Sequence, residues 1–191
     1  MKNVLFLLII TTIGFLGCHK KNHCNSTNSS FNQLYESIHT NNPSLIDDFM
    51  MDLEVHAYTF SVSDTQEVCS IGYQAAPNMS SKNYKIVIID SLSNTVLYSE
   101  NHLFNSNNTS YVTPGISIKL LPGINYTINR IQLNWSPSIT NTVGRVLYSN
   151  NLSIPFPFSD GNITLVSSNF YGTGSPLLNF GVPFIDIVFK K

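Results

Sequence analysis

Three side chains have the chemistry and the surroundings to hold a polar ligand: Arg130, Trp135 and Asp186. In the stretch NYTINRIQLNW the apolar residues change phase by one near Arg130, and the stretch ends on the single tryptophan of the chain, Trp135. A regular strand keeps a period of two, so this change predicts a β-bulge, which is common at edges and near sites. Asp186 has apolar neighbours on its own face of FIDIVF, where a carboxylate needs a partner or a partly wet surface. We therefore take these three residues as the candidate binding surface.

The same residues also fit a purely structural role. Trp135 would then lie in the core, and Arg130 would pair at the surface with an acid such as Asp90 or Asp186. The carboxylate of Asp186 would be held by Arg130 or by a tyrosine hydroxyl. The sequence leaves both interpretations open, because the partners are far apart along the chain.

Catalysis finds little support in the sequence. It contains no Gly-x-Ser-x-Gly and no His-Glu-x-x-His, and GTGSP (172–176) lies between expected strands, without the helix that a phosphate loop requires. Glycosidase chemistry needs two placed carboxylates, and Asp90, Glu100, Asp160 and Asp186 cannot be paired from sequence. We expect no catalytic residues and no cofactor, with a carbohydrate-active enzyme as the remote alternative.

Composition and spacing bear on two other classes of partner. Charged residues are 11% of the chain and the formal net charge is -1, so no electrostatic field exists to hold nucleic acid. His19, His23 and Cys24 lack the spacing of a zinc site, so we predict no metal site. A neutral surface rich in Asn and Ser is typical of an exported, β-rich domain.

The first residues have the pattern of an export signal. An apolar stretch over 4–16, VLFLLIITTIGFL, follows Lys2 and is shorter than the roughly 20 residues of a transmembrane helix. Its end, FLGC (15–18), resembles the bacterial lipoprotein signal, in which a small residue precedes a cysteine that is acylated before cleavage. The resemblance implies a signal peptide over 1–17 and a membrane anchor through lipid on Cys18. The alternative is an ordinary secretory signal that leaves Cys18 as a free thiol.

The residues after Cys18 suggest where the anchored protein would lie. By resemblance to lipoprotein sorting signals, the absence of Asp at position 19 implies the outer membrane. The basic HKK (19–21) implies its periplasmic face more than the cell surface. Residues 18–30 have no hydrophobic periodicity and are rich in Asn and Ser, which predicts a flexible tether.

The two remaining cysteines are expected to differ in environment. Cys24 lies in the predicted tether, whereas Cys69 alternates in phase with Ile71 and Tyr73 and is expected to be a small buried side chain. A Cys24–Cys69 disulfide is the less favoured alternative, because it would tie a strand to a tether.

The rest of the chain predicts an all-β domain. Residues 31–54 form a helical or irregular lead-in, with Leu34 and Ile38 in helical spacing. From residue 55 to 191, about ten short strands alternate with Gly, Pro and Asn turns, and no helix lies between them. This pattern predicts an antiparallel, jelly-roll-like β-sandwich.

Four segments carry a likeness to a known family: YTFSV, VCSIGY, ISIKLLPGINYTI and FYGTGSPLLNFGVPFIDIVF. Their order resembles a bacterial domain of unknown function, a secreted jelly-roll-like sandwich often attached to carbohydrate-active or adhesive proteins. The resemblance covers about residues 55–190 and implies no catalytic residues.

We therefore expect a lipid-anchored, non-catalytic module that binds glycan or another envelope component. The alternative is a structural or assembly lipoprotein that binds another protein. Exposed Trp135 or Tyr rings on a concave face would favour glycan, whereas an uncovered apolar patch or sheet edge would favour protein.

Overall fold

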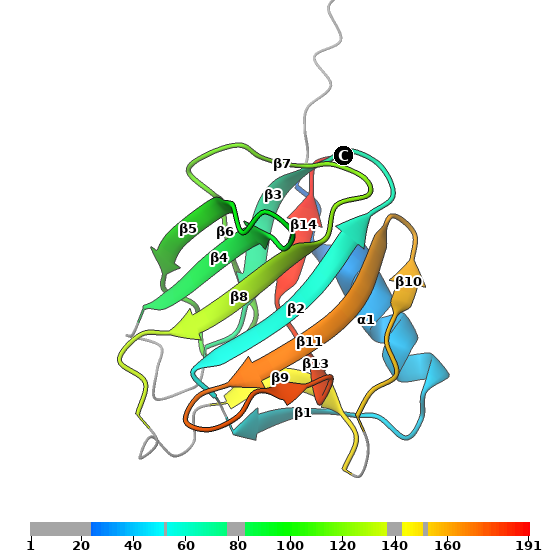
Figure 1. Cartoon of the computed structure of the whole chain (residues 1–191), viewed down its shortest axis with the longest axis vertical. Helices are drawn as coiled ribbons and strands as arrows, with labels where there is room; N and C mark the ends of the chain where they lie inside the picture. Colours follow the sequence, from blue (N-terminus) through cyan, green and yellow to red (C-terminus); the bar gives the residue numbers. More distant parts are fainter. Residues whose placement is uncertain (1–23, 52, 76–82, 137–142, 151–152) are drawn as a thin grey trace, which may run out of the picture.

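The computed structural model describes residues 24–51, 53–75, 83–136, 143–150 and 153–191. Within these residues it contains two helices, η1 (Ser26–Asn28) and α1 (Ser30–Asn41), and fourteen strands (Figure 1). The strands are β1 (Ile46–Met51), β2 (Val55–Val62), β3 (Gln66–Tyr73), β4 (Tyr84–Asp90), β5 (Val96–His102), β6 (Ser110–Val112), β7 (Ile118–Leu120), β8 (Tyr126–Gln132), β9 (Val143–Tyr148), β10 (Phe158–Asp160), β11 (Ile163–Tyr171), β12 (Leu177–Leu178), β13 (Gly181–Pro183) and β14 (Asp186–Phe189).

The strands form three sheets, and every pairing among the described strands is antiparallel. The largest sheet has the order β10-β11-β2-β8-β4-β5, with β12 paired to β11. The second has the order β14-β3-β6, with β7 paired to β3, and the third has the order β1-β9-β13. The predicted all-β antiparallel sandwich is confirmed. The described strands outnumber the expected ten because several are only two to four residues long.

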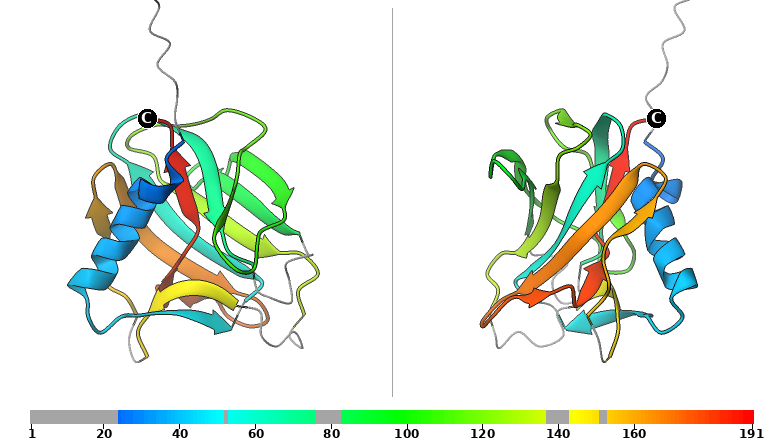
Figure 2. Two further views of the ribbon diagram at one scale, coloured as in Figure 1. Left: turned by 180° about the vertical axis from the view of Figure 1, so that it is seen from behind. Right: turned by 45° about the vertical axis from the view of Figure 1, so that its right-hand side comes forward.

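One face of the largest sheet is covered by a mixed layer. Helix α1 and the β14-β3-β6 sheet lie side by side against that face (Figure 2), and α1 contacts β14, β10 and β11. The β1-β9-β13 sheet lies across one end of the two layers (Figure 1). The helix therefore fills part of the layer that strands alone would form in a simple sandwich.

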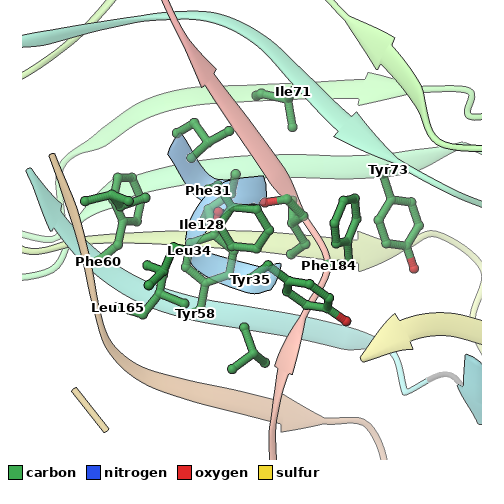
Figure 3. Packing of buried hydrophobic residues seen from close by; sticks show 14 of the residues in the cluster. Phe31, Leu34, Tyr35, Tyr58, Phe60, Ile71, Tyr73, Ile128, Leu165 and Phe184 are labelled. Atoms are coloured by element: carbon green, nitrogen blue, oxygen red, sulfur yellow. Dashed lines mark hydrogen bonds between the residues drawn. The ribbon is translucent and has the colours of Figure 1, made fainter. Parts of the chain in front are cut away.

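Helix α1 is part of the hydrophobic core. Its first turn is capped by Ser29, whose side chain accepts a hydrogen bond from the backbone N–H of Asn32 at 2.9 Å. One face of the helix is buried, and the ring of Phe31 on that face stacks on Tyr58 of β2 with centroids 5.0 Å apart. These rings lie together in Figure 3. Burying large rings contributes strongly to stability, so α1 belongs to the domain and is not merely a lead-in to it.

The second half of the predicted lead-in is a strand. Residues Ile46–Met51 form β1, which pairs with β9, and the side chain of Asp47 is partly buried. Its carboxylate accepts hydrogen bonds from Nη2 of Arg145 at 2.6 Å and from the hydroxyl of Tyr35 at 3.0 Å. The prediction of helical or irregular structure over 46–51 was wrong, because these long-range bonds fix an extended conformation.

The prediction of a tether over 18–30 fails for residues 24–30. Cys24 forms a disulfide with Cys69 of β3 and a β-bridge with Lys190, and η1 follows directly. Residues 18–23 lie outside the described part of the chain. The domain therefore begins at or before Cys24, and the less favoured disulfide is the one that forms.

A bulge explains why Cys69 can reach Cys24. Between Val188 and Phe189 the register of β14 against β3 shifts, which leaves Cys69 as the extra residue of β3. Cys69 is buried, as predicted, but it does not join Ile71 in the main hydrophobic cluster. The strict alternation assumed for this strand therefore breaks at the cysteine itself.

Candidate functional site

Arg130 lies on the inner face of β8, near the middle of the largest sheet, and is fully buried. Its neighbours across the ladder are His56 of β2 and Ile86 of β4. Nη1 of Arg130 donates to the carbonyl oxygens of Leu53 at 3.2 Å and Glu54 at 3.4 Å. The guanidinium is thus a component of the core, where hydrogen bonds to it are strong.

Two tyrosine rings also face this guanidinium. Its central carbon lies 5.3 Å from the ring centroid of Tyr73 and 5.5 Å from that of Tyr84. The two rings pack edge-on against each other at 5.3 Å. Cation–π contacts of this kind stabilise a desolvated guanidinium, so the tyrosines add to the stabilisation from the hydrogen bonds that Arg130 donates to the backbone.

The predicted bulge near Arg130 does not form. The register of β8 against β4 advances one residue at a time through Tyr126–Gln132, and the strand ends there. The following turn contains Asn134 with φ of 59°, so Trp135 lies beyond the strand. The apolar residues change phase along the sequence because Arg130, and not Ile131, points toward the core.

Neither Asp90 nor Asp186, the two acids expected to pair with Arg130 at the surface, forms that pair in the described part of the chain. The carboxylate of Asp90 accepts hydrogen bonds from the backbone N–H groups of Leu92 at 2.9 Å and Ser93 at 3.2 Å. These bonds hold the pKa of Asp90 below its usual value. Asp186 likewise has partners other than Arg130, described below.

Trp135 is half-buried against a glycine. A Cβ placed on Gly172 would lie 2.8 Å from the indole ring, so only a residue without a side chain lets the ring pack here. The indole Nε1 is buried and has no hydrogen-bond partner among the described residues. Trp135 is therefore neither a core residue nor an open stacking platform.

The structure brings two of the three predicted site residues to one place. The carbonyl oxygen of Glu54 accepts from Arg130 and from the backbone N–H of Gln132 at 2.8 Å. The Cβ position of Gly172 that lies next to Trp135 is also 3.4 Å from the backbone nitrogen of Glu54. Arg130 and Trp135 are thus linked through Glu54, whereas Asp186 lies on another sheet.

Asp186 is fully buried at the start of β14 and holds two hydroxyl groups. Oδ1 accepts from the Oγ of Ser29 at 2.5 Å, and Oδ2 accepts from the hydroxyl of Tyr111 at 2.8 Å. The expectation of a tyrosine partner is confirmed. Because Ser29 also caps α1, Asp186 connects the N-terminal segment to the second sheet.

A glycine makes room for the tyrosine of this pair. In the ladder, Gly72 lies between Asp186 of β14 and Tyr111 of β6. A Cβ on Gly72 would lie 2.4 Å from the ring of Tyr111, which is closer than any real contact allows. The missing side chain lets the ring lie across β3 and reach the carboxylate.

Burial raises the pKa of Asp186 from 3.8 to about 6, although the hydrogen bonds from Ser29 and Tyr111 act in the opposite direction. The folded chain therefore binds a proton at Asp186 more tightly than the unfolded chain. The stability that this proton contributes is fully present below about pH 4 and is lost as the pH rises through 6.

We expect Asp186→Asn to remove this dependence. The free energy of unfolding of the wild type, minus that of the variant, should increase by about 2 kcal/mol when the pH falls from 8 to 4. Urea denaturation at a series of pH values measures this difference. In Tyr111→Phe the same transition should move to higher pH, since the hydroxyl lowers the pKa of Asp186. A constant difference would contradict the prediction.

The sequence analysis missed a second cluster, which lies on β5. Tyr98, Glu100 and His102 occupy alternate positions and share the inner face of the strand. The hydroxyl of Tyr98 lies 2.5 Å from Nε2 of His102 and 3.2 Å from Oε2 of Glu100. The alternation in YSENH was a usable signal, because it places these three side chains on one face of a strand.

This cluster can hold or move one proton. With His102 neutral, the hydroxyl of Tyr98 donates to Nε2, and with His102 protonated Nε2–H donates to the hydroxyl, which then donates to Glu100. Burial lowers the pKa of His102, and the nearby Glu100 acts against this shift. Burial and Glu100 both raise the pKa of Tyr98, which keeps its hydroxyl protonated.

Two shallow hollows lie on the turns, away from the predicted site residues. One, of about 370 Å³, is lined by Thr65, Gln66, Glu67, Ser117, Lys119 and Lys190. The other, of about 320 Å³, is lined by Asp90, Ser91, Leu92, Gly123, Ile124 and Asn125. Neither hollow contains Arg130, Trp135 or Asp186.

Cys18, the predicted lipidation site, lies outside the described residues.

In the part of the chain that is described, no group of three or more His, Cys, Asp and Glu is arranged to hold a metal ion. No helix in that part is long and apolar enough to span a membrane.

Comparison with known proteins adds no family: no family model matches the chain, and no curated protein matches it significantly. The resemblances to a lipoprotein signal and to a bacterial jelly-roll-like domain stay predictions.

Proposed function

We propose that this is a lipid-anchored, non-catalytic protein of the bacterial envelope that binds another protein through the free edge of β5. Among the described residues, β5 is the longest strand at a sheet edge, and its side away from β4 pairs with no described strand. Val96 and Leu103, at the two ends of this edge, are 55% and 57% exposed. An uncovered strand edge flanked by apolar side chains can accept a strand from a partner.

The exposed apolar residues favour a protein partner over a glycan. Eight of the ten exposed large hydrophobic residues in the described part of the chain are aliphatic, and the two aromatic ones are Phe49 and Tyr111. Sugar rings stack on aromatic faces, whereas protein interfaces also use aliphatic side chains. Most tyrosine rings, including Tyr58, Tyr73 and Tyr84, are instead buried.

Glycan binding is the second candidate, and Trp135 is the observation that favours it. Its indole N–H is buried without a hydrogen-bond partner among the described residues, and a sugar hydroxyl is a suitable acceptor. The indole ring is half-buried, however, so a sugar ring would meet its edge and not stack on its full face.

The position of Cys24 next to the C-terminus supports the proposed lipid anchor. Cys24 pairs with Lys190, so the first described residue and the C-terminus lie at the same end of the molecule (Figure 1). An anchor at Cys18, six residues earlier, would hold this end near a membrane and leave the β1-β9-β13 end farthest away. The periplasmic face of the outer membrane is the location we propose.

Two experiments test the two parts of the proposal, one for the partner and one for the anchor. A photo-crosslinking amino acid is placed at Leu103 in the full chain, with the same change at Leu178 as the control; Leu178 is 67% exposed and lies beside the opposite part of the sheet. We expect a protease-sensitive adduct from position 103 and none from 178. Intact mass of the protein from its native membrane should show a chain that begins at Cys18 and carries acyl groups, and Cys18→Ala should abolish them.

Either part can fail separately. An unmodified mass for the wild-type chain would overturn the anchor. The absence of an adduct at position 103 would overturn the protein partner. Binding on a glycan array that is lost in Trp135→Phe would establish the second candidate instead.

A further inference from the structure

Three strongly exposed aliphatic side chains lie on turns at the end of the molecule where the described chain begins and ends. Leu92 is 91% exposed in the β4–β5 turn, Ile116 is 54% exposed before β7, and Leu121 is 44% exposed after it. Figure 1 shows β7 beside the C-terminus. Isolated exposed leucines are ordinary, but three at one end form a feature that needs a partner.

Hydrogen bonds place these turns next to one another. The Oγ of Ser117, which follows Ile116, donates to Glu67 at 2.7 Å, and Glu67 pairs with Lys190 near the C-terminus. The backbone N–H of Ser91, which precedes Leu92, donates to the carbonyl oxygen of Asn125 at 2.9 Å. The three apolar residues therefore belong to one continuous set of turns, which we call the turn end.

The distance to the proposed anchor limits what can cover the turn end. Cys24 is held by its disulfide and by Lys190, and Cys18 is six residues earlier. Six residues span at most about 20 Å when fully extended. An acyl group on Cys18 lies within the bilayer, so the end of the domain that carries Cys24 cannot move farther than this from the membrane surface.

We infer that the turn end docks on the lipid bilayer, with Leu92, Ile116 and Leu121 inserted among the headgroups. This inference rests on the proposed lipid anchor. The domain would then have two membrane contacts, the acyl chains and an apolar protein surface. Side chains that reach the boundary between headgroups and acyl chains bind in proportion to the apolar area they bury.

Electrostatic attraction does not drive this contact. Glu67 pairs with Lys190, and Asp90 is bound by the backbone of its own turn, so these charges are compensated locally. Asp64 lies on the turn after β2, Asp160 is the last residue of β10, and Lys119 lies in β7 close to Lys190. The charges are mixed, so the docking should be insensitive to salt and to anionic lipid.

The test uses the full chain, expressed with its leader and reconstituted in phosphatidylcholine vesicles. Leu92→Cys is labelled with an environment-sensitive fluorophore, and Leu178→Cys serves as the control. Both positions are exposed, so neither label should disturb the fold. Because Cys24 and Cys69 are paired and Cys18 would be acylated, the introduced thiol is the one that reacts.

We expect nitroxide-labelled lipids to quench the label at position 92 several-fold more than the label at position 178, in low and high salt alike. Labels at Ile116→Cys and Leu121→Cys should behave like position 92. Equal quenching at 92 and 178 in chains that sediment with the vesicles would overturn the inference and leave the anchor intact. Quenching that disappears in high salt would also overturn it, because the contact would then be electrostatic. Chains that do not sediment would overturn both the anchor and the docking.

Discussion

Removing the disulfide should lower the free energy of unfolding by about 4 kcal/mol, because the bond between Cys24 and Cys69 closes a loop of 45 residues in the unfolded chain. The expected source of the effect is the unfolded state, which gains conformational freedom when the cross-link is absent. We would measure it by urea denaturation of the double variant Cys24→Ala, Cys69→Ala. The loss is a large part of the stability of an ordinary domain.

The reducing agent provides the matched control. Reduction of the wild type should produce the same loss as the double substitution, and the double variant should not respond to reduction. Protease should then cleave the reduced chain near Cys24 and Ser29 before the rest of the domain unfolds. A loss below about 1 kcal/mol would mean that the bond adds little beyond the hydrogen bonds of Ser29 and Asp186.

The β-rich part of the fold was predictable because its signals are local. Short alternating segments and the Gly, Pro and Asn turns between them depend on neighbours within a few positions, and they predicted the antiparallel all-β domain over 55–191. The N-terminal segment was harder, since its order depends on distant groups. Cys24 meets Cys69, and Asp47 meets Arg145, across long separations along the chain.

The candidate site was only partly predictable, for a related reason. A charged residue was assumed to face solvent, so the inward phase of Arg130 was read as a bulge. The need of Asp186 for a partner followed from its apolar neighbours, but the sequence could not decide between Arg130 and a tyrosine, nor say which tyrosine. Tyr111 reaches Asp186 only because Gly72 lies between them in the ladder. The register of three strands had to be known first.

Arg130→Met should destabilise the protein by about 3 kcal/mol, measured as the free energy of unfolding in urea. Methionine fills much of the same volume but donates no hydrogen bond, so the carbonyl oxygens of Leu53 and Glu54 lose a buried donor. It also removes the positive charge that faces the rings of Tyr73 and Tyr84. The effect should be large because Arg130 is fully buried between two central strands.

Arg130→Lys separates charge from geometry. A lysine keeps the charge but lacks the planar group that reaches the backbone of Leu53 and Glu54, so we expect its stability to fall between those of the wild type and the methionine variant. If Arg130 served a ligand instead of the core, Arg130→Met would leave the urea midpoint unchanged and abolish partner capture at position 103. A large loss of stability with capture retained at low temperature would instead assign Arg130 to the fold, and would leave β5 as the surface where binding is decided.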